Sequence, residues 1–366
     1  MHSDVLLVIV VAAALAFDFT NGFHDTANVV ASSISTRALS PRMAVAIASV
    51  LNFAGALVSL KVAATIATGI ISPGKVTESI MFAGLLGAIA WNLLTWVFGL
   101  PSSSSHALIG GVVGALLAAA GGSGVKLGGL VMKVVLPALL APPVAFALAG
   151  VAIVSIYWAI GRRRPGPVTR GFRGGQIISG SALAFAHGSN DAQKTMGVIG
   201  LALVAHGSVS AQHFRVPVWV VIASASAMAL GTYAGGWRII RTVGSRIIKM
   251  NSAQGFAAQG AGAAVILVSS HFGYPLSSTH VISGGVAGAG AATRLSAVRW
   301  GVAGNIAAAW ALTLPAAGLF GAAFYWLQDL LGAGVIGPLL IVFALVSGLA
   351  SLLLARRGRM AEAARA

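Results

Sequence analysis

One phrase occurs twice in this sequence, and it constrains the fold more than any other feature. The first copy is Pro101-Ser-Ser-Ser-Ser-His106, and the second, 174 residues later, is Pro275-Leu-Ser-Ser-Thr-His280. Each is followed by an apolar stretch with three glycines in the same register, namely Gly110, Gly111 and Gly114 in the first and Gly284, Gly285 and Gly288 in the second. A proline and hydroxyl side chains before an apolar stretch predict a helix start, because Ser and Thr oxygens cap the first free N–H groups.

The composition places these two helix starts inside a membrane. Hydrophobic residues make up 57% of the 366 residues and charged residues only 8%, and apolar runs of about 20 residues, the length of a bilayer span, recur along the chain. We therefore predict an all-α polytopic membrane protein. A helix that begins at membrane depth is tolerated only where it faces protein or a wet cavity, so the duplicated motifs indicate a binding site at a repeat interface. The absence of cysteine excludes disulfides and thiolate metal sites.

The apolar runs form two halves with the same plan. Each half is expected to contain a broken span, a second span, a re-entrant helical hairpin with a Pro-Ser motif at its tip, and a closing span. In the first half these are 5–36 with a break at 18–28, 43–71, the hairpin 80–100 and 104–120, and 127–160. In the second half they are 176–204 with a break at 187–191, 216–235, the hairpin 256–273 and 277–292, and 298–327, and one further span is expected at 335–355.

An odd number of crossings in each half makes the halves inverted-topology repeats. We predict a first repeat at 1–161, a cytoplasmic basic linker at 162–174, a second repeat at 175–330, and an extra span with a cytoplasmic tail at 331–366. The net charge of +16 comes largely from short loops on one side of the spans, as the positive-inside rule requires, and not from a nucleic-acid-binding surface. The protein is thus predicted to cross the plasma (inner) membrane several times, with its N-terminus outside and its C-terminus in the cytoplasm. Because the first apolar run lacks the basic start of a signal peptide, we expect it to remain as a span.

Carboxylates inside the predicted spans indicate where cations act. Three of the seven acidic residues, Asp18, Asp25 and Asp191, lie within apolar segments, where a charged side chain costs about 2.5–3.5 kcal/mol on insertion scales. Asn28 follows Asp25 by three residues and Lys194 follows Asp191 by three, so each pair lies on one helix face. Such groups near an unwound helix suit a small cation or a proton relay. The alternative is a buried polar network that only holds helices together, and the duplication argues against it.

The duplicated hydroxyl clusters favour an anion. Two hairpin tips bring two helix N-termini, each with a partial positive charge, toward one point. Free N–H groups and hydroxyls there suit a tetrahedral oxyanion such as phosphate or sulfate. Simple helix capping is the alternative interpretation of a single copy. His106 and His280 follow the hydroxyls either as structural groups or as part of a layer that supports the site, and the glycines predict close helix packing.

Four motifs in this order resemble the inorganic phosphate transporter (PiT) family. They are Gly22-Phe-His-Asp25-Thr-Ala-Asn28, His187-Gly-Ser-Asn190-Asp191-Ala-Gln193-Lys194 and the two Pro-Ser motifs, and together they cover nearly the whole chain. The resemblance implies a homodimeric inverted-repeat carrier that imports phosphate with a coupling cation and needs no cofactor.

The resemblance also implies roles for individual residues. The substrate would be bound by Ser103, Ser104, Ser105, Ser277, Ser278, Thr279, Asn28, Asn190 and Gln193. The coupling ion would be bound or relayed by Asp25, Asn28, Asn190, Asp191 and Lys194, and Asp18, Asn21, His24, His106 and His280 would support these groups. No fixed metal site is expected. Sodium-coupled members carry Asn where this chain has His24 and lack the Gln193-Lys194 pair. Both differences resemble the bacterial low-affinity branch, which implies proton coupling and transport of a metal–phosphate complex, with sodium as the alternative.

Three other functions fit parts of the pattern. Sulfate uptake is the nearest, because sulfate is also a tetrahedral anion. An intramembrane serine hydrolase would use the adjacent Ser and His, but the Gly-x-Ser-x-Gly elbow of such enzymes is absent around these serines, so no enzyme activity is expected. A channel would not need buried carboxylates next to an anion site.

Overall fold

The computed structural model describes residues 2–161, 163–332 and 335–363, and the regular elements in these ranges are all helices. The side chains of residues 2, 3, 238, 241, 245, 246, 349, 350 and 352–363 are not among those described. Several arginines on which the predicted orientation rests therefore lie outside the described side chains, namely Arg162, Arg238, Arg241, Arg246, Arg356, Arg357, Arg359 and Arg365.

The first half contains the long helices α1 (His2–Ser35), α4 (Glu78–Phe98), α5 (Ser104–Ala120) and α7 (Leu136–Ile160). Shorter helices connect them: α2 (Pro41–Ala56), α3 (Lys61–Ala64) and α6 (Leu127–Leu130). Single turns of other helix types lie at Thr65–Ile70, Pro73–Lys75, Gly121–Gly124 and Val131–Val135. The order matches the predicted spans of this half.

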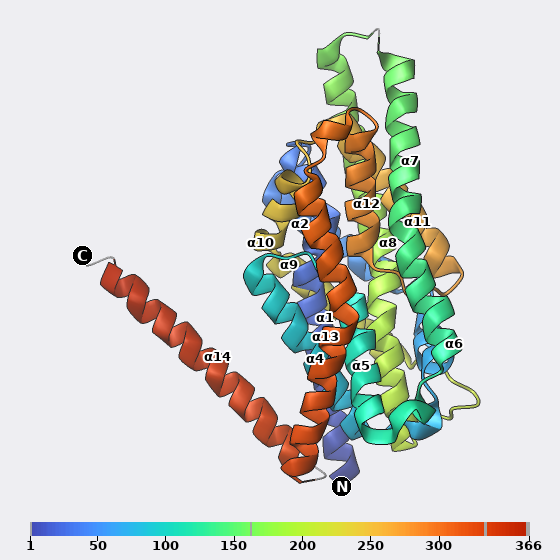
Figure 1. Cartoon of the computed structure of the whole chain (residues 1–366), viewed down its shortest axis with the longest axis vertical. Coiled ribbons are helices and arrows are strands. Elements are labelled where there is room, and N and C mark those ends of the chain that lie inside the picture. Colours follow the sequence, from blue (N-terminus) through green and yellow to red (C-terminus); the bar gives the residue numbers. More distant parts are fainter. Residues whose placement is uncertain (1, 162, 333–334, 364–366) are drawn as a thin grey trace.

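The second half follows with α8 (Pro165–His206), α9 (Val218–Ala234) and α10 (Trp237–Arg241). It continues with α11 (Ser252–His271), α12 (Ser278–Ala291), α13 (Trp300–Leu330) and α14 (Ile336–Ala363), with short turns at Thr242–Arg246 and Leu295–Ala297. In Figure 1, α14 runs away from the body of the molecule, which the other long helices form.

The predicted breaks in the two polar spans are absent. Both α1 and α8 remain helical through their polar stretches. Asp25, Asn28 and Lys194 reach partners on the hairpin tips from an intact helix. The bend lies instead in the second span, where Pro41–Ala56 and Lys61–Ile70 differ in direction by 64°. The predicted linker also differs, since from Pro165 onward it forms the first turns of α8, with proline at a position that tolerates the missing N–H.

The two predicted hairpins, α4–α5 and α11–α12, are present and enter the molecule from opposite ends, so that their tips meet near its middle (Figure 1). Each Pro-Ser motif caps its helix in the same way. Ser103 Oγ accepts the His106 N–H at 3.2 Å, and Ser277 Oγ accepts the His280 N–H at 3.4 Å. Behind the tips, the rings of His106 and His280 lie edge to face with centroids 4.8 Å apart.

The duplicated glycines let helices pack at backbone contact, as predicted. A methyl group on Gly114 would lie 2.0 Å from the carbonyl oxygen of Gly318 in α13, and one on Gly288 would lie 2.1 Å from that of Phe146 in α7. The last long helix of the first half, α7, therefore packs on the hairpin of the second half, and α13 packs on the hairpin of the first half. These contacts hold the two tips against each other.

Five helices among the described residues are long and apolar enough to cross a membrane, or six if the bent pair counts as one span. They confirm a multi-pass membrane protein. The polar helix α8 is not among the five, because its buried face carries the charged and amide side chains of the central site.

Candidate functional site

Two buried carboxylates and the hydroxyls of both hairpin tips form the centre of the molecule. Asp25 of α1 and Asp191 of α8 are each 1% exposed. Ser278 Oγ lies 3.5 Å from a carboxylate oxygen of each, and Ser104 Oγ donates a hydrogen bond of 2.5 Å to Asp25 Oδ2. The sequence motifs from both halves thus converge on one point.

Each carboxylate has a basic partner on its own helix. His24 Nδ1 lies 2.8 Å from Asp25 Oδ1, and His187 Nε2 lies 3.2 Å from Asp191 Oδ2. Asp191 also receives Lys194 Nζ at 2.5 Å. A buried carboxylate is costly unless it is paired and hydrogen-bonded, so these partners explain how the two acids are kept inside the bundle.

Lys194 joins α8 to both hairpin tips. Its ammonium donates to Ser105 Oγ at 2.5 Å in the first tip and to the Leu276 carbonyl at 2.6 Å in the second. The side chain is 1% exposed, so it stays inside the bundle and does not extend to a membrane interface, as a lysine near the end of a span can. Lys194 therefore links the two hairpin tips at the centre of the molecule.

Two asparagine amides complete the centre, and the side-chain oxygen of each has no hydrogen-bond partner among the described residues. Asn28 Nδ2 donates to Thr279 Oγ1 at 2.8 Å, and Asn190 Nδ2 donates to Ser270 Oγ at 2.8 Å. Both of these oxygens are buried. An unsatisfied buried acceptor costs about 1–3 kcal/mol, so these two oxygens retain unused hydrogen-bonding capacity in the centre.

Comparison with known proteins identifies the family. The model of the Phosphate transporter family matches residues 21–170 and again 162–321. The chain belongs to this family. The two matches overlap at residues 162–170.

Relatives named "Probable low-affinity inorganic phosphate transporter" occur in several bacteria. That of Mycobacterium leprae is 53% identical over 346 residues, which is 93% of this chain and 83% of the relative. Those of Rhizobium meliloti and Bacillus subtilis are 49% and 42% identical over 89% of this chain and 97% and 98% of their own. The predicted family resemblance is confirmed, and this is a family of transporters and not of enzymes.

One solved structure, "The sodium-dependent phosphate transporter", has the same fold. It superposes with a TM-score of 0.81 at 24% identity and covers 89% of this chain and 99% of its own.

Several residues predicted for this transporter's site have other contacts. Gln193 accepts the Val62 N–H at 2.9 Å and donates to the Ser189 carbonyl, so its amide fixes the start of α3 and does not face the tips. Ser103 and Ser277 are occupied as helix caps. His280 stacks on Trp310 with ring centroids 4.2 Å apart, which places this histidine behind the site.

Asp18 and Asn21 also belong to α1 and precede Asp25, on the side of the helix's N-terminus. Asp18 Oδ1 accepts a hydrogen bond of 2.6 Å from Thr195 Oγ1, whereas its Oδ2 and the Asn21 side-chain oxygen are buried without a partner among the described atoms. These two residues therefore lie beside the central site and not in it.

Sequence reasoning gave His187 too little weight. The ligand atoms of Asp25, His187 and Asp191 all lie within 4.8 Å of one another, and carboxylates with an imidazole are a donor set that suits a divalent metal ion. The signal in the sequence was the i, i+4 spacing of His187 and Asp191 on one helix face.

Proposed function

We propose that this transporter imports inorganic phosphate by symport with protons and binds the anion between the two hairpin tips. The carrying observation is that Lys194 and the free ends of α5 and α12 meet at the buried pair Asp25 and Asp191. Positive helix ends, hydroxyl donors and an ammonium suit an oxyanion. The names of the relatives support phosphate as the substrate and a low affinity of the transporter for it.

Hydroxyls of both tips would bind the anion. Ser104, Ser105 and Ser278 already bond to the central charged groups, and Thr279 accepts from the Asn28 amide. Phosphate would replace some of these partners. Phosphate carries a proton at neutral pH and can donate a hydrogen bond to a carboxylate such as Asp25 or Asp191, whereas sulfate carries no proton and cannot donate one. The nearby carboxylates therefore support phosphate over sulfate.

The coupling step follows from the Lys194–Asp191 pair. When a proton neutralises Asp191, the ammonium of Lys194 loses its partner and becomes available to phosphate, so proton and anion bind together. The spare oxygens of Asn28 and Asn190 favour the alternative, a sodium ion, and the solved structure of the same fold is named for sodium. The cluster of Asp25, His187 and Asp191 supports cargo in the form of a metal–phosphate complex.

The proposal includes the topology. Two inverted repeats, with α1, α4–α5 and α7 matched by α8, α11–α12 and α13, would alternate access to the site. The N-terminus would lie outside, and the basic segment that joins α7 to α8 would lie in the cytoplasm, with two copies forming a homodimer in the inner membrane.

Uptake into proteoliposomes tests this function. We expect labelled phosphate to accumulate when the outside is acidic, without sodium, and to be unaffected by a tenfold excess of sulfate. Addition of magnesium is expected to raise uptake if the complex is the cargo. Strict sodium dependence would replace the proton by sodium, and equal competition by sulfate would overturn the choice of anion.

A further inference from the structure

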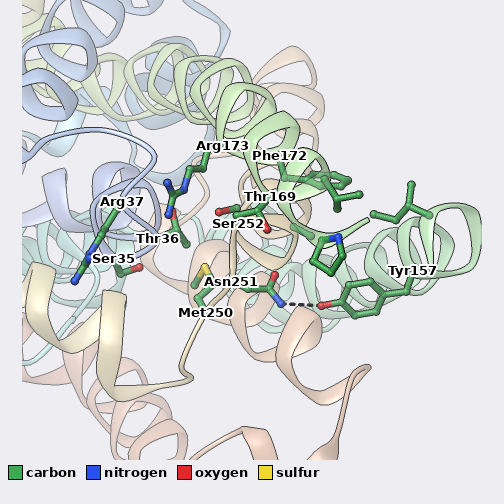
Figure 2. Close-up of a pocket in the computed structure, with 14 residues that line it drawn as sticks. Ser35, Thr36, Arg37, Tyr157, Thr169, Phe172, Arg173, Met250, Asn251 and Ser252 are labelled. Atoms are coloured by element: carbon green, nitrogen blue, oxygen red, sulfur yellow. Dashed lines mark hydrogen bonds between the residues drawn. The ribbon is translucent and has the colours of Figure 1, made fainter. Parts of the chain in front are cut away.

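A cavity of about 510 Å³ lies between the end of α1, the end of α7, and the starts of α8 and α11. Figure 2 shows Arg37 and Arg173 there, together with hydroxyl side chains from Ser35, Thr36, Thr169 and Ser252. The described residues that line the cavity include no carboxylate. Guanidinium groups among hydroxyls, without a competing acid, are suited to a phosphate group.

The backbone conformation at Arg37 is unusual for an arginine. Arg37 has φ of 58°, the left-handed conformation at which helices commonly end in glycine. The Ala38 N–H bonds to the Ser33 carbonyl at 2.9 Å across this turn, as in helices that end with glycine. An arginine thus occupies a position where the backbone favours glycine, and such a departure is a basis for a functional hypothesis.

A line of buried polar groups leads from the cavity into the molecule. Thr36, which lines the cavity, donates to Gln176 Oε1 at 2.7 Å. One turn deeper, Gln259 Nε2 donates to Ser33 Oγ at 2.9 Å and to the Val29 carbonyl at 3.2 Å. Both glutamines are 0% exposed.

The line ends at the hairpin tips. Asn28, Ser32 and Thr36 are spaced by four residues, which places them on one face of α1, and Asn28 bonds to Thr279 of the second tip. Ser32 Oγ and Gln176 Nε2 are buried without a partner among the described atoms. Polar groups with unused hydrogen-bonding capacity are costly in an apolar bundle, and they are useful along a route for an anion.

Two glycines give the glutamines their room. A methyl group on Gly255 would lie 2.1 Å from Gln176 Nε2, and one on Gly180 would lie 3.0 Å from Gln259 Nε2. The two amides are thus tightly packed between the cavity and the tips.

We propose that the cavity is a phosphate-binding vestibule at the inner mouth of the transporter, and that Gln176 and Gln259 form the gate between it and the central site. This inference rests on the proposed import of phosphate and on the proposed orientation. Phosphate released from the tips would pass the two amides and bind Arg37 and Arg173 before it enters the cytoplasm.

The cysteine-free chain allows a direct test of binding. A single thiol is introduced by Ser35→Cys at the cavity wall, and its reaction with a membrane-impermeant thiol reagent is followed in liposomes of zwitterionic lipid. We expect inorganic phosphate to slow labelling. In the same background, Arg37→Gly and Arg173→Gln should each raise the half-protecting phosphate concentration about tenfold, as expected for one charged hydrogen bond.

The variant Arg37→Gly separates binding from folding. Because glycine fits the left-handed backbone, this variant should unfold at the same temperature or a higher one while it loses protection. Arg42→Gln, an exposed arginine of α2 outside the cavity, is the matched control and should keep full protection. An absence of protection by phosphate, or unchanged half-protection in both variants, overturns the vestibule. Protection that follows added phosphatidylglycerol and not phosphate assigns the cavity to a lipid headgroup and overturns its place on the route.

The gate has its own readout. A thiol at the buried position Ser32 (Ser32→Cys) should react slowly, and Gln176→Ala with Gln259→Ala should accelerate its labelling at least tenfold. Unchanged labelling in the double variant overturns the gate. Neither assay depends on uptake, so protection without phosphate uptake overturns the proposed function alone, whereas uptake with an unprotected Ser35→Cys thiol overturns the vestibule alone.

Discussion

The ammonium of Lys194 lies 2.5 Å from Asp191 Oδ1, and both side chains are 1% exposed. The first half has a neutral amide, Asn28, at the position that corresponds to Lys194. The two halves therefore pair their carboxylates differently, Asp25 with His24 and Asp191 with both His187 and Lys194. Because of this asymmetry, we expect that protons, and not sodium ions, drive transport, and that the coupling group is Asp191 in the second half.

Replacement of Lys194 tests the built-in cation. We expect Lys194→Asn to reduce proton-driven uptake or to make uptake depend on sodium, because the asparagine oxygen offers a metal ligand where an ammonium offers only donors. Loss of one partner from a buried pair costs about 3–5 kcal/mol, so thermal unfolding is measured alongside. The double variant Lys194→Asn with Asp191→Asn controls for the unpaired charge, and the exposed Lys126→Asn controls for net charge. Proton-driven uptake at the parent rate in Lys194→Asn would contradict the role.

Asp25 is expected to be indispensable for gradient-driven uptake. Asp25→Asn preserves shape but removes the charge that accepts from Ser104 and pairs with His24. Accumulation of labelled phosphate in proteoliposomes should fall to background, while the variant inserts and unfolds like the parent protein. Accumulation near the parent level would reduce Asp25 to a structural group.

Hydroxyls at the tips should separate into binding and capping groups. Ser105→Ala and Thr279→Ala each remove a donor next to the central charges, and a hydrogen bond to a charged group is worth about 1.5–3 kcal/mol, so phosphate affinity should fall about ten- to a hundredfold. Ser103→Ala and Ser277→Ala are the matched controls. They remove helix caps and should cost about 1 kcal/mol of stability with little effect on affinity. The measurements are phosphate binding by calorimetry and thermal unfolding, and equal affinity in the Ser105→Ala, Thr279→Ala double variant would contradict the assignment.

Local signals in the sequence were sufficient for the hairpins. A Ser cap acts on an N–H three residues away, so the starts of α5 and α12 could be read from the two motifs alone, and the glycine register predicted close packing. The breaks in α1 and α8 were predicted wrongly, because what keeps these helices intact lies far away in the sequence. Asp25 is bonded by Ser104, and Asn28 by Thr279.

The bend between α2 and α3 had no local signal either. Gln193, more than a hundred residues later, accepts the first N–H groups of α3, and no pattern near α3 records this. The same holds for Gln176 and Gln259, whose partners on α1 lie in the other half of the chain. A pairing between distant helices leaves no periodicity that a single sequence displays.

Asp18 is the remaining buried acid, and its contacts suggest a part in coupling. It is 0% exposed, bonds to Thr195 next to Lys194, and forms no salt bridge among the described residues. Gly22 of α1 packs against the backbone of Met228 in α9. One turn earlier on both helices, Asp18 faces Ser224. A carboxylate without a basic partner inside a membrane costs about 2.5–3.5 kcal/mol of stability. An acid that is retained at this cost is better explained by binding of a proton or cation than by a structural role.

We therefore expect Asp18→Asn, which keeps the Thr195 contact, to unfold at the same temperature or a higher one and to bind phosphate normally. The number of protons carried with each phosphate should fall, measured by pH-sensitive dye and labelled phosphate in the same vesicles, with Thr195→Val as a control that removes the contact and keeps the acid. An unchanged ratio together with lowered stability would make Asp18 a structural residue.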